Sequence, residues 1–249
     1  MMILSLVNQK GGVGKTTTAV SLTAALTQLG KRVLLCDFDP QANATSGMGA
    51  EKKSPSVYDV IINGRDPGSV ILHTKYGDLL PSGADLAGAG IELVSLSRRE
   101  FRLRDALEPL RDKYDYIFID CPPSLELLTL NALIAADQVL IPVQCEYYAL
   151  EGLSDLMSTL RAVKRSFQPN IAVFGLVLTM YDGRTNLSMQ VAQEVRRHFP
   201  GKVFTTVIPR NVRLSEAPSH GMPITAYDRL SRGAESYLQL AGEIIGKES

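Results

Sequence analysis

Short apolar runs recur along the chain, and they are almost solidly apolar rather than alternating with polar residues. This pattern is typical of strands that are buried on both faces of a mostly parallel sheet. We therefore predict strands at Ile3–Val7, Val33–Cys36, Tyr116–Ile119, Val139–Val143, Val173–Leu178 and Val203–Ile208.

Helical periodicity occupies most of the intervals between these runs. In the interval Thr16–Leu29, the residues Ala19, Leu22 and Leu26 fall on one helical stripe, and Gly30 follows as a natural stop. Further helices are predicted at Leu125–Ala136, Ala149–Arg165, Leu187–His198 and Ala234–Ile245. Strand–helix alternation of this kind predicts an α/β fold with a doubly wound, mostly parallel sheet and right-handed crossovers.

We expect one domain that spans residues 1–249. A chain of 249 residues suits one large α/β domain, and no internal repeat, low-complexity tract or long linker interrupts it. The interval from Gly47 to Leu110 has the least regular pattern, and mixed helices and short strands are expected there.

Composition points to a soluble protein of a reducing compartment, which we expect to be the cytoplasm. Apolar residues make up 45% of the chain and charged residues 21%, near the average for soluble proteins. The three cysteines are too few and too scattered for a disulfide framework. The sequence shows neither a secretory leader nor an apolar run of about 20 residues, the length that spans a bilayer.

The strongest chemical signal is the loop Gln9-Lys10-Gly11-Gly12-Val13-Gly14-Lys15-Thr16-Thr17, between the first predicted strand and the first predicted helix. Glycines let successive backbone N–H groups turn toward phosphate oxygens, and the positive end of the next helix favours an anion. Lys15 is placed to reach the β- and γ-phosphates, and the Thr16 hydroxyl is placed to ligate Mg²⁺. The alternative is a glycine-rich turn with an incidental lysine.

Carboxylates follow two other predicted strands. The second strand runs into Asp37-Phe38-Asp39, and the third runs into Asp120. Ligands of open α/β sheets bind at the carboxyl ends of the strands, so these carboxylates are expected to face the same phosphates as Lys15. Carboxylates beside a triphosphate suit Mg²⁺, usually through its retained waters. Taken singly, each aspartate is as compatible with a helix cap or a turn.

The loop also carries a resemblance to a known family. Lys10-Gly11-Gly12-Val13-Gly14-Lys15-Thr16 resembles the deviant Walker A motif of the ParA/MinD family of P-loop ATPases. Further motifs are similar to the chromosome-partitioning ParA (Soj) branch: Asp37-Phe38-Asp39-Pro40-Gln41-Ala42-Asn43-Ala44-Thr45, Asp120-Cys121-Pro122-Pro123-Ser124, Met180-Tyr181-Asp182-Gly183-Arg184-Thr185 and Val207-Ile208-Pro209-Arg210-Asn211-Val212-Arg213-Leu214. Together they span nearly the whole chain.

The resemblance implies a P-loop NTPase fold and a weak ATPase that uses ATP and Mg²⁺. It further implies an ATP-bound sandwich homodimer, non-specific binding to double-stranded DNA on the nucleoid, and hydrolysis stimulated by a ParB-type partner. No N-terminal helix-turn-helix module is expected, because the glycine loop begins at residue 10. Binding to a specific operator sequence is therefore not expected.

The resemblance also implies roles for individual residues. Lys10 corresponds to the signature lysine that reaches the partner's nucleotide, where its charge would act as an arginine finger does. Lys10, Lys15 and Asp39 would be catalytic, with Asp39 activating the attacking water. Metal contacts are implied for Thr16, Asp39 and Asp120. The implied nucleotide contacts are Lys10, Gly11, Gly12, Val13, Gly14, Lys15, Thr16, Thr17, Pro209 and Asn211.

For DNA, the resemblance points to Arg213. The 26 basic residues balance the 26 acidic ones, so any DNA-binding surface must be a local patch. Phosphate contacts need only charge and reach, so binding should be sequence-blind and salt-sensitive. Other basic residues that are candidates for the patch are Arg184, Arg196, Arg197, Lys202, Arg210, Arg229 and Arg232.

Other functions on the same scaffold remain open at this point. A MinD-like membrane-cycling ATPase needs a basic amphipathic C-terminal helix, whereas this chain ends in Leu238-Gln239-Leu240-Ala241-Gly242-Glu243-Ile244-Ile245-Gly246-Lys247-Glu248-Ser249, so no membrane partner is expected. A metabolic ligase or an iron–sulfur reductase component is a second alternative. A nucleotide switch without hydrolysis is a third.

Overall fold

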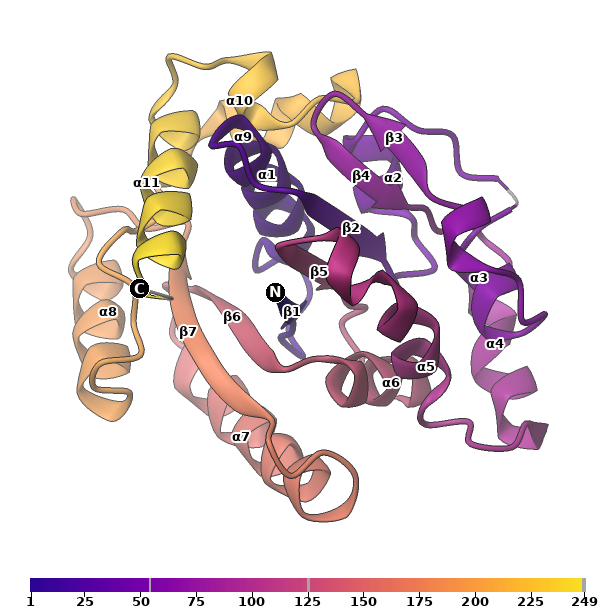
Figure 1. The fold of residues 1–249 in the computed structure, drawn as a ribbon. Helices are drawn as coiled ribbons and strands as arrows, with labels where there is room; N and C mark the ends of the chain where they lie inside the picture. Colours follow the sequence, from indigo (N-terminus) through magenta and orange to yellow (C-terminus); the bar gives the residue numbers. More distant parts are fainter. Residues whose placement is uncertain (54, 125, 248–249) are drawn as a thin grey trace.

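A seven-stranded sheet runs through the middle of the computed structural model, which describes residues 1–53, 55–124 and 126–247 (Figure 1). The strand order is β3-β4-β2-β5-β1-β6-β7. The strands are β1 (Met2–Leu6), β2 (Val33–Asp37), β3 (Leu72–Thr74), β4 (Gly77–Leu80), β5 (Tyr116–Asp120), β6 (Gln138–Gln144) and β7 (Ala172–Thr179).

All pairings are parallel except the one between β3 and β4, which are antiparallel. The central strands are buried on both faces, as their apolar composition predicts. In β5, for example, Ile117 and Ile119 belong to one core, whereas Tyr116 and Phe118 belong to the other. The predicted α/β fold with a mostly parallel sheet is confirmed.

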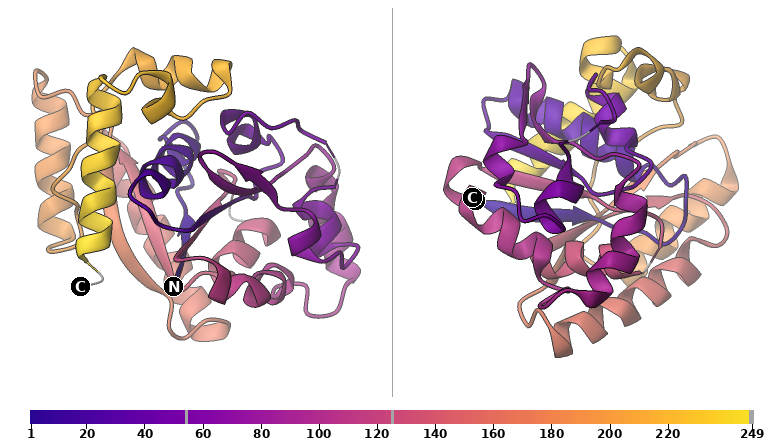
Figure 2. Two further views of the ribbon diagram at one scale, coloured as in Figure 1. Left: turned by 45° about the horizontal axis from the view of Figure 1, so that its top comes forward. Right: turned by 90° about the vertical axis from the view of Figure 1, so that its right-hand side faces the viewer.

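Helices cover both faces of the sheet (Figure 2). One layer holds α1 (Lys15–Gln28), α2 (Asn43–Gly47), α9 (Val212–Glu216), α10 (Ile224–Tyr227) and α11 (Arg232–Gly246). The other holds α3 (Val57–Ile61), α4 (Leu86–Glu92), α5 (Arg102–Leu107), α6 (Leu127–Ala135), α7 (Ala149–Ser166) and α8 (Asn186–His198). No helix in the described part of the chain is both long and apolar enough to cross a membrane.

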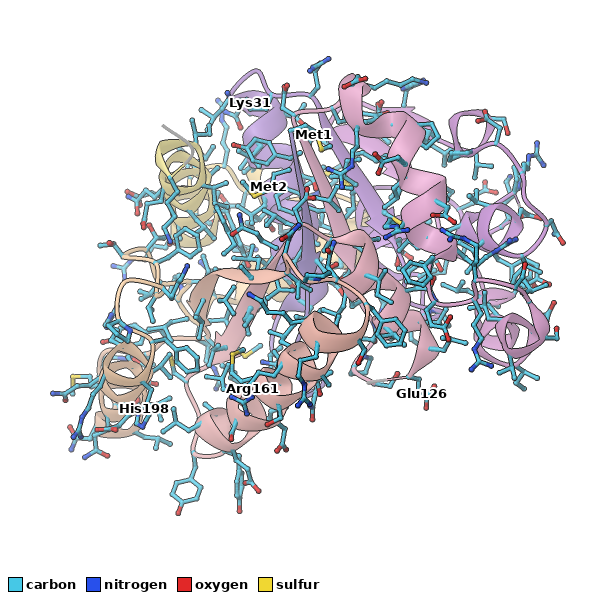
Figure 3. The ribbon with its side chains drawn as sticks, turned by 60° about the horizontal axis from the view of Figure 1, so that its bottom comes forward. Met1, Met2, Lys31, Glu126, Arg161 and His198 are labelled. Carbon is cyan, nitrogen blue, oxygen red and sulfur yellow. The ribbon has the colours of Figure 1, made fainter. Side chains whose placement is uncertain are left out.

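The parallel strands direct their carboxyl ends to one edge of the sheet. Met1, Met2 and Lys31 mark the opposite edge, where β1 and β2 begin (Figure 3). The carboxyl ends of β1, β2, β5 and β6 therefore share one edge, and the glycine loop, Asp37, Asp39 and Asp120 lie at or directly after three of these ends.

Most predicted elements are present, with ends that differ by one or two residues. The helix predicted from Leu125 begins at Leu127; Leu125 itself lies outside the described residues. The interval from Gly47 to Leu110 contains short helices and the strands β3 and β4, as expected.

The strand predicted at Val203–Ile208 is wrong. This segment runs beside β7 and bonds to it at its two ends, where the Phe204 N–H donates to Leu176 and the Ile208 N–H donates to Leu178. Between these points, the N–H groups of Thr205 and Thr206 donate to the Glu243 carboxylate of α11, at 2.9 and 2.7 Å. A side chain therefore takes the donors that a regular strand would offer to its neighbour.

Gly175 permits a close approach of the Val203–Ile208 segment to the sheet. It follows a register shift between β6 and β7. A Cβ built on Gly175 would lie 2.4 Å from the Phe204 ring, which is itself buried. The absence of a side chain at this position lets the ring pack directly on the strand.

Gly175→Ala is expected to destabilise the protein by about 1–3 kcal/mol, because the Phe204 ring must move out of a packed core. The matched control is Gly152→Ala in α7, where a Cβ meets nothing within 4 Å. This control should be neutral or gain about 0.5–1 kcal/mol from helix propensity. Urea unfolding of both variants measures the effects, and equal stability of the two would contradict the packing argument.

Candidate functional site

The glycine loop joins β1 to α1 at the carboxyl edge of the sheet. Gly12 and Gly14 adopt positive φ angles of 74° and 90°, which glycine reaches without strain. Gly14 is the N-cap of α1, and no side chain caps the first turn of this helix. The first backbone N–H groups of α1 are therefore available to an anion at the positive end of the helix.

Lys15 lies under the loop and is almost fully buried, with 7% of the residue exposed. Its ammonium donates to the carbonyls of Asn8 at 3.0 Å and Lys10 at 3.2 Å. Burial lowers the pKa of Lys15, while Asp120 and Asp39 oppose that shift. The Lys15 side chain thus places its ammonium inside the loop, between the two carbonyls.

Asp120 ends β5 beside Asp37, the last residue of β2, and the two are register partners. Asp120 is fully buried, and neither of its carboxylate oxygens accepts a hydrogen bond of normal geometry within the described chain. Burial raises its pKa well above the usual range, and Asp37 adds to that shift. The nearby Thr16 hydroxyl and Lys15 act in the opposite direction.

A buried carboxylate without a donor is costly unless a cation compensates it. The Thr16 hydroxyl, the Asp120 carboxylate and the adjacent Asp39 are all hard oxygen ligands, so this corner fits Mg²⁺. No cluster of three or more His, Cys, Asp or Glu side chains able to hold a metal occurs within residues 1–53, 55–124 and 126–247. The site therefore suits an ion that completes its coordination with phosphate and water rather than an ion held by protein alone.

Asp39 lies in the loop after β2 and is 8% exposed. Its Oδ1 accepts the Gln41 N–H at 2.9 Å. Its charge contributes to the pKa shifts of both Lys15 and Asp120, which places all three groups in one site.

Asp37 has a different environment from the one expected. Its Oδ2 accepts both the N–H and the hydroxyl of Thr45, each at 2.7 Å. Burial raises the pKa of Asp37 to about 6, although these hydrogen bonds act to lower it. The prediction that Asp37 faces the phosphates is therefore corrected: it holds the start of α2.

Lys10 points away from its own loop. Its ammonium pairs with Glu146 at 2.7 Å, and about 40% of each side chain is exposed. Gln144 donates to the other oxygen of Glu146. Sequence reasoning missed Glu146; its position two residues after the end of β6, at the same edge of the sheet, is the signal that would have found it.

Pro209 and Asn211 line a cavity of about 440 Å³ beside Gly14 and Thr17. Asn211 also caps α9, where its Oδ1 accepts the Arg213 N–H at 2.8 Å. The lining also includes Met180, Val212 and Leu214 from the motifs quoted above, together with residues that the sequence did not single out: Thr179, Ser215, Pro218 and Tyr237. The mostly apolar walls suit a flat aromatic ring next to the phosphate loop.

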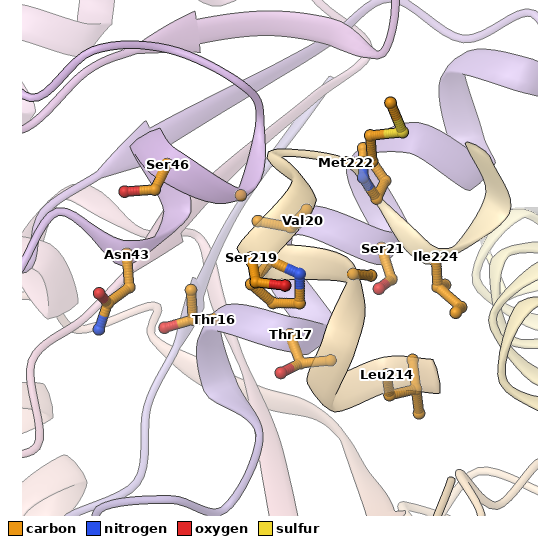
Figure 4. Close-up of a pocket in the computed structure, with 14 residues that line it drawn as sticks. Thr16, Thr17, Val20, Ser21, Asn43, Ser46, Leu214, Ser219, Met222 and Ile224 are labelled. Atoms are coloured by element: carbon orange, nitrogen blue, oxygen red, sulfur yellow. The ribbon is translucent and has the colours of Figure 1, made fainter. Parts of the chain in front are cut away.

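A second cavity, of about 430 Å³, shares Thr17, Leu214 and Pro218 with the first, and Figure 4 shows the residues that line it. Thr16 and Thr17 line it from α1, while Asn43 and Ser46 line it from α2. The start of α1 thus lines both cavities. The second cavity is also lined by α2, the helix that follows the Asp37–Asp39 loop.

Arg213 is exposed on α9, but its guanidinium is not free. It pairs with Glu216 at 2.8 Å and with Asp228 at 3.4 Å. Three other candidate arginines, Arg184, Arg210 and Arg232, line one surface hollow of about 510 Å³. Arg184 pairs with Asp182 at 2.8 Å, whereas neither Arg210 nor Arg232 has an ion-pair partner in the described residues.

Comparisons with known proteins agree on one group of relatives. A family profile described as an AAA domain matches residues 1–173. Sporulation initiation inhibitor protein Soj of Bacillus subtilis is 57% identical over 246 residues, 97% of this chain and 97% of that protein. Chromosome partitioning protein ParA of Myxococcus xanthus is 53% identical, over 99% of this chain and 89% of that protein.

Among solved structures, one match is cobyrinic acid a,c-diamide synthase from Mycobacterium smegmatis with bound ADP and magnesium. It superposes with a TM-score of 0.86 at 38% identity, covering 98% of this chain and 94% of that one.

Asp120→Asn is expected to stabilise the protein by about 1–3 kcal/mol at pH 8 without nucleotide, because it removes a buried charge that accepts no hydrogen bond of normal geometry from the described residues. The raised pKa of Asp120 means that the wild type loses stability as pH rises through that pKa; the variant should lose less. The same change should weaken the Mg²⁺-dependent part of nucleotide binding.

Thermal unfolding with and without nucleotide and Mg²⁺ measures both effects of the Asp120→Asn substitution. A variant that is less stable than the wild type at pH 8, or that keeps full Mg²⁺-dependent affinity, would show that Asp120 does not have this role.

Proposed function

The chain belongs to the Soj and ParA family of chromosome-partitioning ATPases, and we propose that ATP controls its assembly into a homodimer that binds DNA. It is an ATPase that uses ATP and Mg²⁺. In this proposal residues 1–249 act as a single P-loop domain. The phosphate cradle between β1 and α1 is the observation that carries the proposal.

The nucleotide lies along the start of α1 in this proposal. The amides of the Lys10–Thr17 loop bind the phosphates, and the Lys15 ammonium exchanges the Asn8 and Lys10 carbonyls for the β- and γ-phosphates. The base occupies the cavity beside Pro209 and Asn211. Mg²⁺, held through Thr16 and Asp120 with Asp39 nearby, neutralises phosphate charge when bound.

Hydrolysis needs an oriented water and a cation at the transferred phosphate. Asp39 carries an oxygen next to the cradle and would orient and activate that water. Lys10 would supply the cation to the nucleotide of a second protomer, after release from Glu146.

The open side of the loop supports closure by a second copy of the chain. Gly11 is exposed, and a Cβ built there meets nothing within 4 Å in its own protomer. Lys10, beside it, extends over the surface to Glu146. A partner that approaches this side would bury both phosphate sites between the two protomers.

The Arg184–Arg210–Arg232 hollow, with Arg213 on the neighbouring helix α9, supports binding to non-specific double-stranded DNA. Unpaired guanidinium groups bind phosphate at little cost, because no salt bridge must first be broken. Arg213 would contribute only after exchange with Glu216 and Asp228. Dimerisation doubles this surface, so hydrolysis would weaken DNA binding.

The proposal includes a ParB-type protein that stimulates hydrolysis, and a location on the nucleoid in the cytoplasm. A MinD-like membrane role is disfavoured, because the apolar residues Tyr237, Leu240 and Ile244 of α11 are buried in the core. A metabolic role is disfavoured because identity to Soj is 57%, against 38% to the diamide synthase structure.

Gly11→Val tests the dimer. The variant should bind ATP and remain monomeric in size-exclusion chromatography with ATP and Mg²⁺, because the new side chain occupies the space that the partner must enter. The control is Gly242→Val on α11, which is equally exposed and open. It should dimerise as the wild type does, and normal dimerisation of Gly11→Val would refute this geometry.

A double substitution, Arg210→Ala with Arg232→Ala, tests the DNA surface. DNA affinity should fall, and the magnitude of the slope of its logarithm against that of the salt concentration should decrease by about 2 for each protomer that contacts DNA, one unit for each lost phosphate contact. Arg161→Ala with Arg165→Ala removes the same charge from exposed positions of α7 and controls for net charge; Figure 3 labels Arg161. A wild-type slope in the double variant would exclude the hollow as the DNA site.

A further inference from the structure

Four residues around the Asp39 loop form a closed ring of hydrogen bonds. Thr45 donates its hydroxyl to Asp37 Oδ2 at 2.7 Å and accepts the Ser82 N–H at 2.9 Å. The Ser82 hydroxyl donates to the Asp39 carbonyl at 2.8 Å, and the Asp39 N–H donates to Asp37 Oδ1 at 3.3 Å. Each of these four hydrogen bonds joins a different pair of the four residues.

The ring joins parts of the chain that are far apart in sequence. Asp37 ends β2, Thr45 lies in α2, and Ser82 follows β4. Asp37, Thr45 and Ser82 are fully buried, and Asp39 is 8% exposed. Buried hydrogen bonds of this kind hold their partners firmly, because water cannot replace a lost partner.

A strained residue, Ala42, lies in the same loop as Asp39, which shows that the surrounding contacts determine the shape of this loop. Ala42 is fully buried and adopts a φ of 51°, in the left-handed region that non-glycine residues avoid. Its N–H donates to the same Asp39 carbonyl that accepts the Ser82 hydroxyl, at 2.9 Å. Such strain persists where neighbouring groups over-determine the backbone, and it is concentrated at functional sites.

We propose that the Asp37–Thr45–Ser82–Asp39 ring positions Asp39 for the attack of water on the nucleotide, with Thr45 and Ser82 as positioning residues. The inference rests on the proposed role of Asp39. The ring and Ala42 fix the Asp39 backbone, and the Gln41 N–H fixes Oδ1. Asp39 Oδ2 has no hydrogen-bond partner within the part of the chain described, so one oxygen stays available to a water.

Hydrogen bonding separates this role from that of the phosphate cradle. Among the residues that the structure describes, no hydrogen bond of Thr45 or Ser82 reaches the Lys10–Thr17 loop. Disturbing the ring should therefore change the orientation of the attacking water and leave phosphate binding largely intact.

The test is Thr45→Val, which keeps the shape of the side chain and removes the hydroxyl. We expect kcat for ATP to fall roughly 10-fold to 100-fold, the range for a small misplacement of a reacting group. The Kd for ATP should stay within about 3-fold, because only the catalytic step loses an interaction. Thr45→Ser restores the hydroxyl and should recover most of kcat.

The matched control is Thr23→Val in α1. The Thr23 hydroxyl is equally buried and donates to the Ala19 carbonyl at 2.8 Å, outside the ring. Thr23→Val should lose stability to a similar extent but keep kcat. A Thr45→Val protein whose kcat matches that of Thr23→Val, or whose ATP affinity falls in parallel with kcat, would overturn the proposal.

Ser82→Ala supplies a second arm that does not depend on the folding of Thr45→Val. It removes one donor to the Asp39 carbonyl and keeps the Ser82 N–H. Its kcat should fall roughly 3-fold or more, and the double variant with Thr45→Val should lose much less than the product of the single losses. Fully multiplicative losses would show that the two residues act separately and not through one ring.

Asp39→Ala distinguishes failure of this inference from failure of the proposed function. If Asp39→Ala stops turnover while Thr45→Val and Ser82→Ala retain wild-type kcat, the ring proposal alone is wrong. If Asp39→Ala turns over ATP normally, the role of Asp39 is wrong, and the ring proposal falls with it.

Discussion

Buried charge at the carboxyl edge of the sheet is the constraint on which the rest of the structure depends. Asp37 and Asp120 are fully buried on adjacent strands, Asp39 lies close by, and the Lys15 ammonium opposes them in charge. Three carboxylates near one lysine leave an excess of negative charge that burial makes costly. A divalent cation beside a phosphate chain is the ligand that this imbalance favours, because it would compensate Asp120, whose oxygens accept no hydrogen bond of normal geometry from the described residues.

The same charges explain why the fold is arranged as it is around the glycine loop. Parallel pairing of β2 with β5 and of β5 with β1 brings two aspartates and the loop to one edge. The uncapped start of α1 then faces them with the positive end of a helix. The Asp37 carboxylate accepts hydrogen bonds from Thr45 and from the Asp39 N–H, so the start of α2 is linked to the buried charge at this edge.

The fold and the principal site residues could be predicted from the sequence because each carries a local signal. Solid apolar runs identified five of the strands, and the glycine spacing located the loop with Lys15 and Thr16. The pairing of Lys10 with Glu146 and the Asp37–Thr45–Ser82–Asp39 ring could not be predicted, because they join residues far apart in sequence. The error at Val203–Ile208 has the same cause, since the donors of that apolar segment are taken by Glu243 of α11.

The Val203–Ile208 segment, which is not a regular strand, limits how copies of the chain can associate. A regular strand at the rim of a sheet exposes a row of unpaired amides that invites another chain to add on. Here the segment covers β7, and Glu243 occupies its central amides, while the opposite rim ends in β3, which has only three residues. Growth of the sheet from one molecule into the next is therefore blocked at the β7 edge, which leaves the loops at the carboxyl ends of the strands as the surface that the proposed ATP-dependent dimer would use.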